Sequence, residues 1–196
     1  MKYDVMLVGS SAGGVDAFRR LFKMLPANFP LPVVVVHHIL KASNISHQAV
    51  YGSAASVPVI EIEDKMKLER GKIYFSPPDY HTLIERNLIA SLDFSEPVNH
   101  SRPSIDVTFL SAAEEFESRV IALLLTGANE DGARGLLRLS ENKAYTIVQS
   151  LADAEVPYMP AASLRILQPN FVGTIEQIGD HLNQLLNTKP ELGGVL

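Results

Sequence analysis

The chain has 196 residues, of which 46% are hydrophobic and 20% are charged, and its formal net charge is −5 at pH 7. This size and composition predict one soluble globular domain, and the acidic charge disfavours a nucleic-acid-binding protein, which is usually basic. The absence of cysteine excludes disulfides, thiolate metal sites and a cysteine nucleophile. The sequence has no signal-peptide pattern and no apolar run of the ~20 residues that span a bilayer. We therefore expect a cytoplasmic protein that is not embedded in a membrane.

The first predicted strand leads into a glycine-rich turn. Residues 5–8 form an apolar run typical of a buried strand, and residues 15–25 carry apolar side chains at helical spacing. Between them, Gly9 to Gly13 matches the pattern G-x-S-x-G with Ser11 at its centre. Small residues on both sides let the chain reverse sharply, so that a serine hydroxyl stands out at the carboxyl end of the strand.

Three interpretations of this turn are open at this point. It is a nucleophile elbow, a dinucleotide-binding loop of the form G-x-G-x-x-G, or a tight turn without chemistry. Gly9 and Gly14 fit the outer glycines of the second pattern, but Ser11 stands where a middle glycine lets the backbone approach a pyrophosphate. No lysine followed by serine or threonine comes after the glycines, which excludes a phosphate-binding P-loop.

The second predicted strand is a run of four valines, residues 33–36, that ends in His37 and His38. Such a β-branched run is typical of a strand buried on both faces. A dinucleotide fold needs an acidic residue near the end of this strand to hold a ribose hydroxyl. The two histidines therefore disfavour a cofactor site and favour a hydrolase.

The rest of the chain alternates strands and helices. Strands are predicted over residues 57–62, 72–76, 120–125, 144–149 and 171–174. Helices are predicted from Ser43 or Asn44 to about residue 56, and over residues 104–117, 133–142, 160–167 and 175–186. Residues 64–71 are expected to form a charged turn, and residues 81–85 and 88–92 a small antiparallel hairpin.

This alternation is typical of a single α/β domain. We expect a doubly wound, mostly parallel sheet with helices on both faces, in addition to the small hairpin. Residues 1–188 are assigned to this domain, and residues 189–196 are expected to be a mobile tail.

Ligand and catalytic sites in such sheets lie at the carboxyl ends of the strands. This rule selects Ser11 after the first strand, His38 after the second, and Asp131 after the strand at residues 120–125. A hydroxyl nucleophile needs a base to take its proton and a carboxylate to orient that base, so these residues form a candidate catalytic triad. Each also has a simpler explanation: Ser11 as a turn former, His38 as a strand-end histidine bonded to backbone, and Asp131 as the cap of the following helix. No H-x-x-x-H or comparable spacing points to a metal site.

Several motifs resemble, in the same order, those of the catalytic domain of the chemotaxis receptor methylesterase, the CheB family. The resemblance runs from about residue 3 to about residue 179. The family motif G-A-S-T-G-G is similar to residues 9–14, the family histidine falls on His38, and L-T-G-M-G-N-D-G is similar to residues 125–132. Residues 76–81, 101–106 and 158–162 also resemble family stretches.

The resemblance implies a serine esterase that removes methyl groups from glutamyl methyl esters on chemoreceptor helices and can deamidate receptor glutamines. It implies Ser11 as the nucleophile, His38 as the general base and Asp131 as the residue that orients the imidazole. Backbone amides at Ala12 and Ala128 are expected to hold the oxyanion. No metal or organic cofactor is implied.

The chain departs from the family pattern beside these residues. Ala12 replaces a threonine, Ala128 a methionine and Glu130 an asparagine. Backbone donors survive the first two changes, so we expect activity to be altered rather than abolished. Glu130 adds a negative charge that disfavours an acidic receptor surface. His81 and Arg102 are expected to shape the receptor-facing cleft.

Because the catalytic strand begins near residue 3, we expect this chain to lack the N-terminal receiver domain that many family members carry. Constitutive activity, control by a separate regulatory protein, and a substrate other than a chemoreceptor are then open alternatives. Two further functions are also open: a serine hydrolase that acts on a different ester, and a catalytically silent binding module of the same fold.

Overall fold

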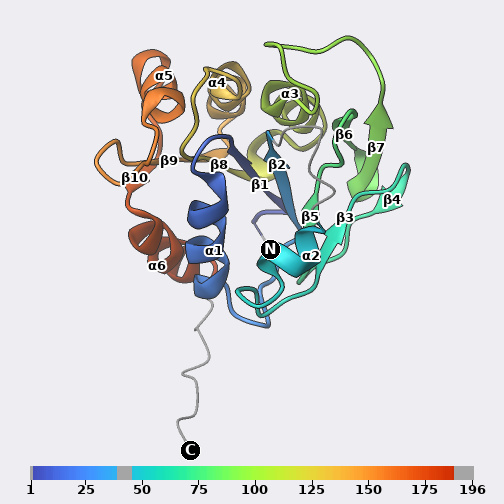
Figure 1. The fold of residues 1–196 in the computed structure, drawn as a ribbon, viewed down its shortest axis with the longest axis horizontal. Helices are drawn as coiled ribbons and strands as arrows, with labels where there is room; N and C mark the ends of the chain where they lie inside the picture. The colour runs from blue at the N-terminus through green and yellow to red at the C-terminus, as the bar shows by residue number, and fades with distance from the viewer. Residues whose placement is uncertain (1, 39–45, 188–196) are drawn as a thin grey trace, which may run out of the picture.

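The computed structural model describes residues 2–38 and 46–187. Its centre is a seven-stranded sheet with the order β10-β9-β8-β1-β2-β5-β3, and every neighbouring pair is parallel (Figure 1). Its strands are β1 (Val5–Ser10), β2 (Val33–His37), β3 (Val59–Glu61), β5 (Ile73–Phe75), β8 (Val120–Leu124), β9 (Tyr145–Gln149) and β10 (Phe171–Gly173). The predicted fold class is confirmed.

Helices cover both faces of this sheet. They are α1 (Gly14–Met24), α2 (His47–Tyr51), α3 (Ile105–Phe116), α4 (Ala133–Glu141), α5 (Tyr158–Ile166) and α6 (Ile175–Leu185). In Figure 1, α3, α4 and α5 lie along one side of the sheet, and α1, α2 and α6 along the other. Two hydrophobic clusters fill the two layers, and successive residues of β1 alternate between them: Met6 and Val8 in one, Val5 and Leu7 in the other.

The predicted hairpin is part of a three-stranded antiparallel sheet. Its strands, in spatial order, are β4 (Met66–Lys67), β7 (Ile89–Asp93) and β6 (His81–Glu85), with a 3-10 turn, η1 (Arg86–Leu88), joining β6 to β7. The segment predicted as a charged turn over residues 64–71 therefore contains a short strand. Met66 and Lys67 are paired with Ala90 and Ile89, a contact between distant segments that local sequence does not reveal.

The helix predicted to run from residue 43 or 44 to about residue 56 is shorter in the structure. Helix α2 begins after Ser46, whose side chain accepts a hydrogen bond from Ala49 N, and it ends at Gly52. Ser43 and Asn44, the predicted caps, lie outside the described residues, as does the predicted tail at 189–196.

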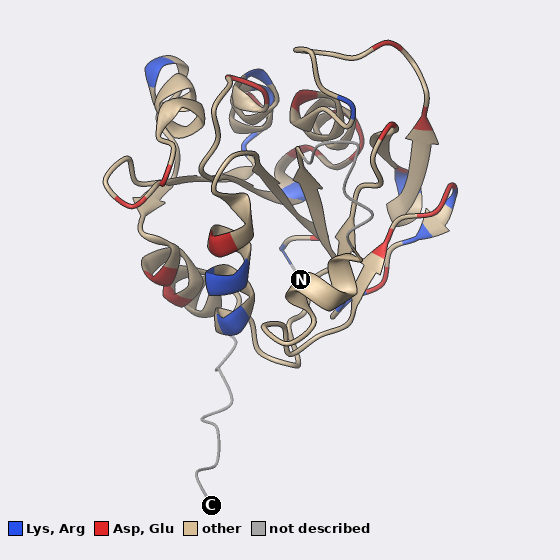
Figure 2. Cartoon of the chain, in the orientation of Figure 1, with Lys and Arg blue, Asp and Glu red and all other residues tan. Residues whose placement is uncertain are grey.

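Basic and acidic positions are interspersed along the helices and loops (Figure 2). Arg20 of α1 forms ion pairs with Glu176 of α6 and with Asp153, both at 2.7 Å, and so ties α1 and α6 to the loop after β9. Within residues 2–38 and 46–187, no helix is long and apolar enough to cross a membrane.

The chain order changes direction at β1. From β1 the chain passes to β2, then to the edge strand β3 and back to β5 between them, and later returns through α3 to β8 on the other side of β1. Crevices at such a switch point are where open α/β sheets place their ligands. The carboxyl ends of β1, β2 and β8 meet there.

Candidate active site

The turn after β1 lies in close contact with residues from other parts of the chain. Gly13, the N-cap of α1, has φ 79°, and a Cβ at this position would lie 2.8 Å from Glu155 Cβ and 2.9 Å from Thr126 Oγ1. A Cβ at Gly14 would lie 2.6 Å from His37 Nε2. Side chains at these positions would therefore push the turn away from its neighbours, which explains the paired glycines.

The two serines of this turn have different surroundings. Ser10 is fully buried, and its hydroxyl donates a 2.7 Å hydrogen bond to the carbonyl of Thr126. Ser11 is partly exposed, and within the described part of the chain its hydroxyl makes no hydrogen bond. Of the two serines, Ser11 is the one whose hydroxyl is partly exposed and not engaged by another described residue.

Thr126, two residues after the end of β8, holds the turn in place. Its carbonyl accepts a hydrogen bond from Ser11 N at 3.0 Å, and its hydroxyl donates to Ala12 O at 2.9 Å. The same hydroxyl accepts from Val156 N at 2.9 Å. These contacts fix the backbone on both sides of Ser11. Sequence reasoning missed this role of Thr126, although the residue lies near a strand end where a site is expected.

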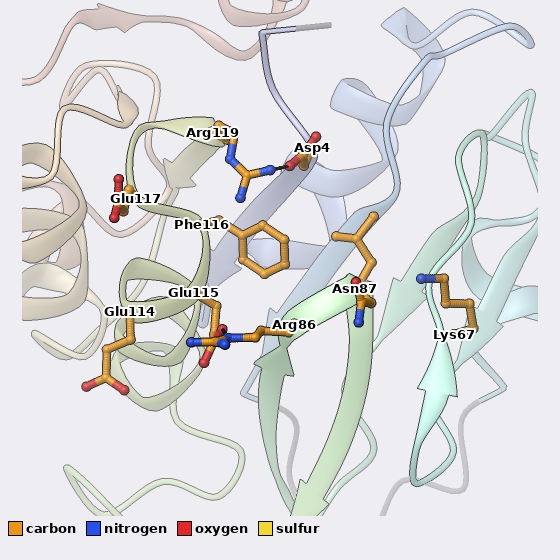
Figure 3. A pocket seen from close by; sticks show the side chains of 10 residues that line it. Asp4, Lys67, Arg86, Asn87, Glu114, Glu115, Phe116, Glu117 and Arg119 are labelled. Carbon is orange, nitrogen blue, oxygen red and sulfur yellow. Dashed lines mark hydrogen bonds and ion pairs between the residues drawn. The ribbon is translucent and has the colours of Figure 1, made fainter.

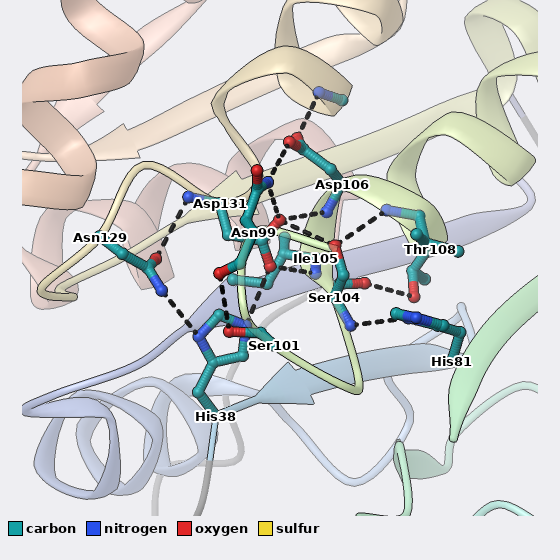
Figure 4. Close-up of polar contacts among 12 residues, drawn as sticks. His38, His81, Asn99, Ser101, Ser104, Ile105, Asp106, Thr108, Asn129 and Asp131 are labelled. Carbon is teal, nitrogen blue, oxygen red and sulfur yellow. Dashed lines mark hydrogen bonds and ion pairs between the residues drawn. The ribbon is translucent and has the colours of Figure 1, made fainter. Parts of the chain in front are cut away.

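His38 and Asp131 are in direct contact. His38 Nε2 lies 2.9 Å from Asp131 Oδ2, and the Asp131 side chain is completely buried (Figure 4). Asn129 supports the pair, because its amide nitrogen lies 3.5 Å from His38 Nδ1 and its oxygen accepts from Asp131 N. The structure thus brings together two of the three residues predicted from the sequence and leaves Ser11 without a hydrogen bond to the imidazole.

Asp131 receives donors from a helix distant in sequence. Its carboxylate accepts hydrogen bonds from Ile105 N at 2.6 Å, Ser104 Oγ at 2.8 Å and Asn99 Nδ2 at 3.0 Å. Burial raises the pKa of Asp131, but the hydrogen bonds from His38, Asn99 and Ile105 outweigh burial and hold this pKa below its usual range. The residue is therefore an anion at neutral pH.

The interpretation of Asp131 as the cap of the following helix is wrong. The N-cap of α4 is Gly132, with φ 91° and no side-chain cap. Asp131 instead contacts the amino end of α3, whose backbone amides and positive dipole end stabilise its charge.

His37 supports the turn from the other side. Its Nε2 lies 3.1 Å from the carbonyl of Ser11, and its Nδ1 lies 3.5 Å from the Tyr51 hydroxyl. Burial lowers the pKa of His37 to about 4, so the ring is neutral at pH 7 and Nε2–H donates to Ser11 O.

Two backbone amides are available near Ser11. Within the described residues, no hydrogen bond uses the amides of Ala12 and Ala128, whereas Gly127 N donates to Val156 O. A backbone amide without a hydrogen-bond partner can receive the negative oxygen of a tetrahedral intermediate.

His81 contacts the loop that leads to α3, and Arg102 belongs to that loop. His81 is completely buried; its Nδ1 accepts from Ser104 N, and its Nε2 lies 3.1 Å from Glu96 O. Arg102 donates to the carbonyls of Phe94 and Ser95 and stacks over the Phe94 ring. His81 thus differs from the expectation of a residue that shapes the cleft surface, because its side chain is buried and both ring nitrogens contact the backbone of the loop before α3.

Two other kinds of site, a metal centre and a surface pocket, were considered in the described part of the chain. No group of three or more His, Asp or Glu in residues 2–38 and 46–187 could hold a metal ion. A hollow of about 540 Å³ lies near the amino ends of β1 and β8, opposite Ser11 (Figure 3). Its lining includes Arg86 paired with Glu115, and Arg119 paired with Asp4, and it has no serine or histidine.

A family model described as CheB methylesterase matches residues 6–182. The chain belongs to the CheB methylesterase family. A putative protein-glutamate methylesterase/protein-glutamine glutaminase of Leptospira interrogans is 37% identical over 180 residues, which cover 92% of this chain and 93% of that protein.

Other relatives are longer or structurally characterised. A protein-glutamate methylesterase/protein-glutamine glutaminase of Saccharophagus degradans is 34% identical, and the match covers 81% of this chain but 46% of that protein. The crystal structure of the CheB methylesterase catalytic domain of Thermotoga maritima matches with a TM-score of 0.88 and 29% identity, over 93% of this chain and 98% of the other. The likeness extends over nearly the whole fold.

Proposed function

We propose that this protein is a carboxylic-ester hydrolase, a protein-glutamate methylesterase that acts on methylated glutamates of chemoreceptor helices. The observation that carries the proposal is the contact between His38 Nε2 and the buried Asp131, 2.9 Å apart, at the edge where the Ser11 turn ends. The names of the relatives, which cite both methylesterase and glutaminase activity, support the substrate class. The expected cytoplasmic location and the possible separate regulatory protein belong to the same proposal.

The first half of the reaction forms an acyl-enzyme. Ser11 Oγ attacks the γ-carbonyl carbon of the methylated glutamate and gives its proton to His38 Nδ1, the ring nitrogen that does not face Asp131. Asp131 stabilises the imidazolium. The amides of Ala12 and Ala128 stabilise the oxyanion. The carbon–oxygen bond to the methoxy group then breaks, and this group takes the proton from His38 and leaves as methanol.

The second half restores the enzyme. A water molecule gives a proton to His38 and attacks the acyl carbon, the bond to Ser11 breaks, and the proton returns to the serine. On a glutamine side chain the same steps release ammonia in place of methanol. Approach of substrate has to bring Ser11 Oγ and His38 Nδ1 together, as such contacts often tighten only in the substrate complex. Every step uses groups of this chain, and the proposal requires no cofactor.

The proposal is tested by methanol release from a methylated chemoreceptor fragment. The wild-type protein should release methanol, and Ser11→Ala should lower kcat by at least about 10³-fold, because the nucleophile is lost. Ser10→Ala is the matched control. It removes the neighbouring hydroxyl, which faces Thr126, and should retain readily measurable release. No release by the wild type, on a fragment that a known family enzyme demethylates, would contradict the proposal and favour another ester or a binding role.

A further inference from the structure

A second buried carboxylate lies beside Asp131 and has no part in the proposed reaction. Asp106, in the first turn of α3, is 3% exposed. The Asn99 side-chain nitrogen lies 3.0 Å from Asp106 Oδ2 and 3.0 Å from Asp131 Oδ1, so that one amide group bridges the two carboxylates (Figure 4). Asn99 itself belongs to the exposed segment before α3.

The two carboxylates also accept hydrogen bonds from backbone amides across the pair of helices α3 and α4. Asp131, which precedes α4, accepts from Ile105 N and Asp106 N at the start of α3. Asp106 of α3 accepts from Gly135 N, 2.7 Å away, at the start of α4. Each carboxylate therefore satisfies amides of the other helix, and the two amino ends are fixed relative to each other.

This arrangement brings two acidic groups together away from water. Burial raises the pKa of Asp106 above its usual range, and the neighbouring Asp131 raises it further. Two carboxylates that share one hydrogen-bond donor repel each other strongly when solvent does not screen their charges. The amide of Asn99 supplies a donor that both carboxylates share, which reduces the repulsion.

We propose that Asn99 is a positioning residue for the reaction: by bridging Asp106 and Asp131 it keeps the Asp131 carboxylate directed at His38. The inference rests on the proposed function of the site. Asn99 is suited to the place, because its backbone has φ 51°, a left-handed conformation that asparagine tolerates better than most residues. Arg102, which donates to the carbonyls of Phe94 and Ser95, holds the other end of the segment.

Two substitutions at this position test the bridge. Asn99→Ala removes the shared donor, and we expect kcat for methanol release to fall about tenfold with little change in KM. Asn99→Asp sets a third carboxylate against the other two. We expect a larger loss of kcat and a shift of the acid limb of the pH profile to higher pH, because added negative charge favours the protonated imidazole that cannot act as base.

Matched controls come from the next residue of the same segment. His100 is exposed and, within the described residues, has no hydrogen bond or ion pair. His100→Ala likewise truncates the side chain to a methyl group, and His100→Asp likewise introduces a carboxylate, one position along. Both should keep the kcat and the pH profile of the wild type.

A double variant separates the bridge from a general effect on folding. Asp106→Asn keeps an oxygen for Gly135 N and removes the charge. If Asn99 acts by bridging two carboxylates, Asn99→Ala should lower kcat less in the Asp106→Asn background than in the wild type. Thermal unfolding of each variant reports whether it is folded at the assay temperature.

Labelling by a fluorophosphonate, which reacts with an activated serine, is measured in parallel with methanol release. If the wild type is labelled at Ser11 but releases no methanol, the proposed substrate is wrong, and the labelling rate still tests Asn99. If both Asn99 variants match the His100 controls, the inference is overturned. A rise in KM at constant kcat would also overturn it, since Asn99 would then contact substrate rather than position Asp131.

Discussion

The two neighbouring histidines at the end of β2 have different partners and different roles. His38 faces the buried Asp131, whereas His37 packs against Phe18 and reaches the carbonyl of Ser11. A neutral His37 donates to that carbonyl, so it supports the backbone of the serine turn without entering the proton transfers. The pair H-H in the sequence therefore encodes one candidate base and one structural donor.

The low pKa of His37 predicts a dependence of stability on pH. Its pKa is about 4 in the folded chain and about 6.5 in the unfolded chain, so the unfolded state binds a proton first as the pH falls. The stabilisation is fully present above pH ~6.5 and is lost as the pH falls towards 4, by at most roughly 3 kcal/mol. His37→Gln keeps an N–H donor for Ser11 O but does not titrate.

Urea unfolding between pH 4 and 7 checks this prediction. Over that interval the free energy of unfolding should fall by more in the wild type than in His37→Gln, and the difference between them is the contribution of His37. Equal losses in the two proteins would show that the ring is not buried in its neutral form.

At the scale of elements, α3 and α6 both begin after a residue whose side-chain hydroxyl caps the helix, but the two hydroxyls have different further hydrogen-bond partners. Ser104 accepts from Val107 N and donates to Asp131 Oδ1, whereas Thr174 forms a capping box with Gln177 far from the site. Ser104→Ala and Thr174→Ala should each cost about 1–2 kcal/mol of unfolding free energy. The first should also lower kcat several-fold, because Asp131 loses a donor.

Comparing unfolding free energy with methanol release for these two variants tests the link between α3 and the site. The Thr174→Ala protein should keep wild-type kcat below its unfolding transition. If both variants lose activity in proportion to stability, the cap of α3 has no specific role in orienting Asp131.

Some of these elements were predicted from the sequence more accurately than others. The strands were predictable because apolar and β-branched runs such as Val33–Val36 are buried on both faces. The predicted extent of α2 was wrong: the helix ends at Tyr51, and the glycine that follows, Gly52, is a stop signal that the prediction passed over. The donors to Asp131 were not predictable, because they lie 25–32 residues away and meet it only through packing of α3 against α4. Ser11 as nucleophile stays a prediction.

At the scale of the whole molecule, the candidate site depends on the three central strands. Strands β2, β1 and β8 are adjacent, and each has neighbours on both sides, whereas β3 and β10 form the edges and are three residues long. Val172 of β10 is 44% exposed, while all of β1, β2 and β8 is buried. The strand ends that carry Ser11, His38 and Asp131 thus belong to the best-packed part of the fold.

This arrangement predicts the order of local stability. Backbone amides of β1, β2 and β8 should exchange with solvent only through global unfolding, and those of β10 through local opening at a lower free energy. Native-state hydrogen exchange at increasing denaturant measures both. Exchange of β8 as fast as that of β10 would mean that Thr126 and Asp131, which follow β8, rest on a strand that opens locally. The site could then not be held rigid by its strands, and the loops around Asn99 and Asn129 would have to fix its geometry.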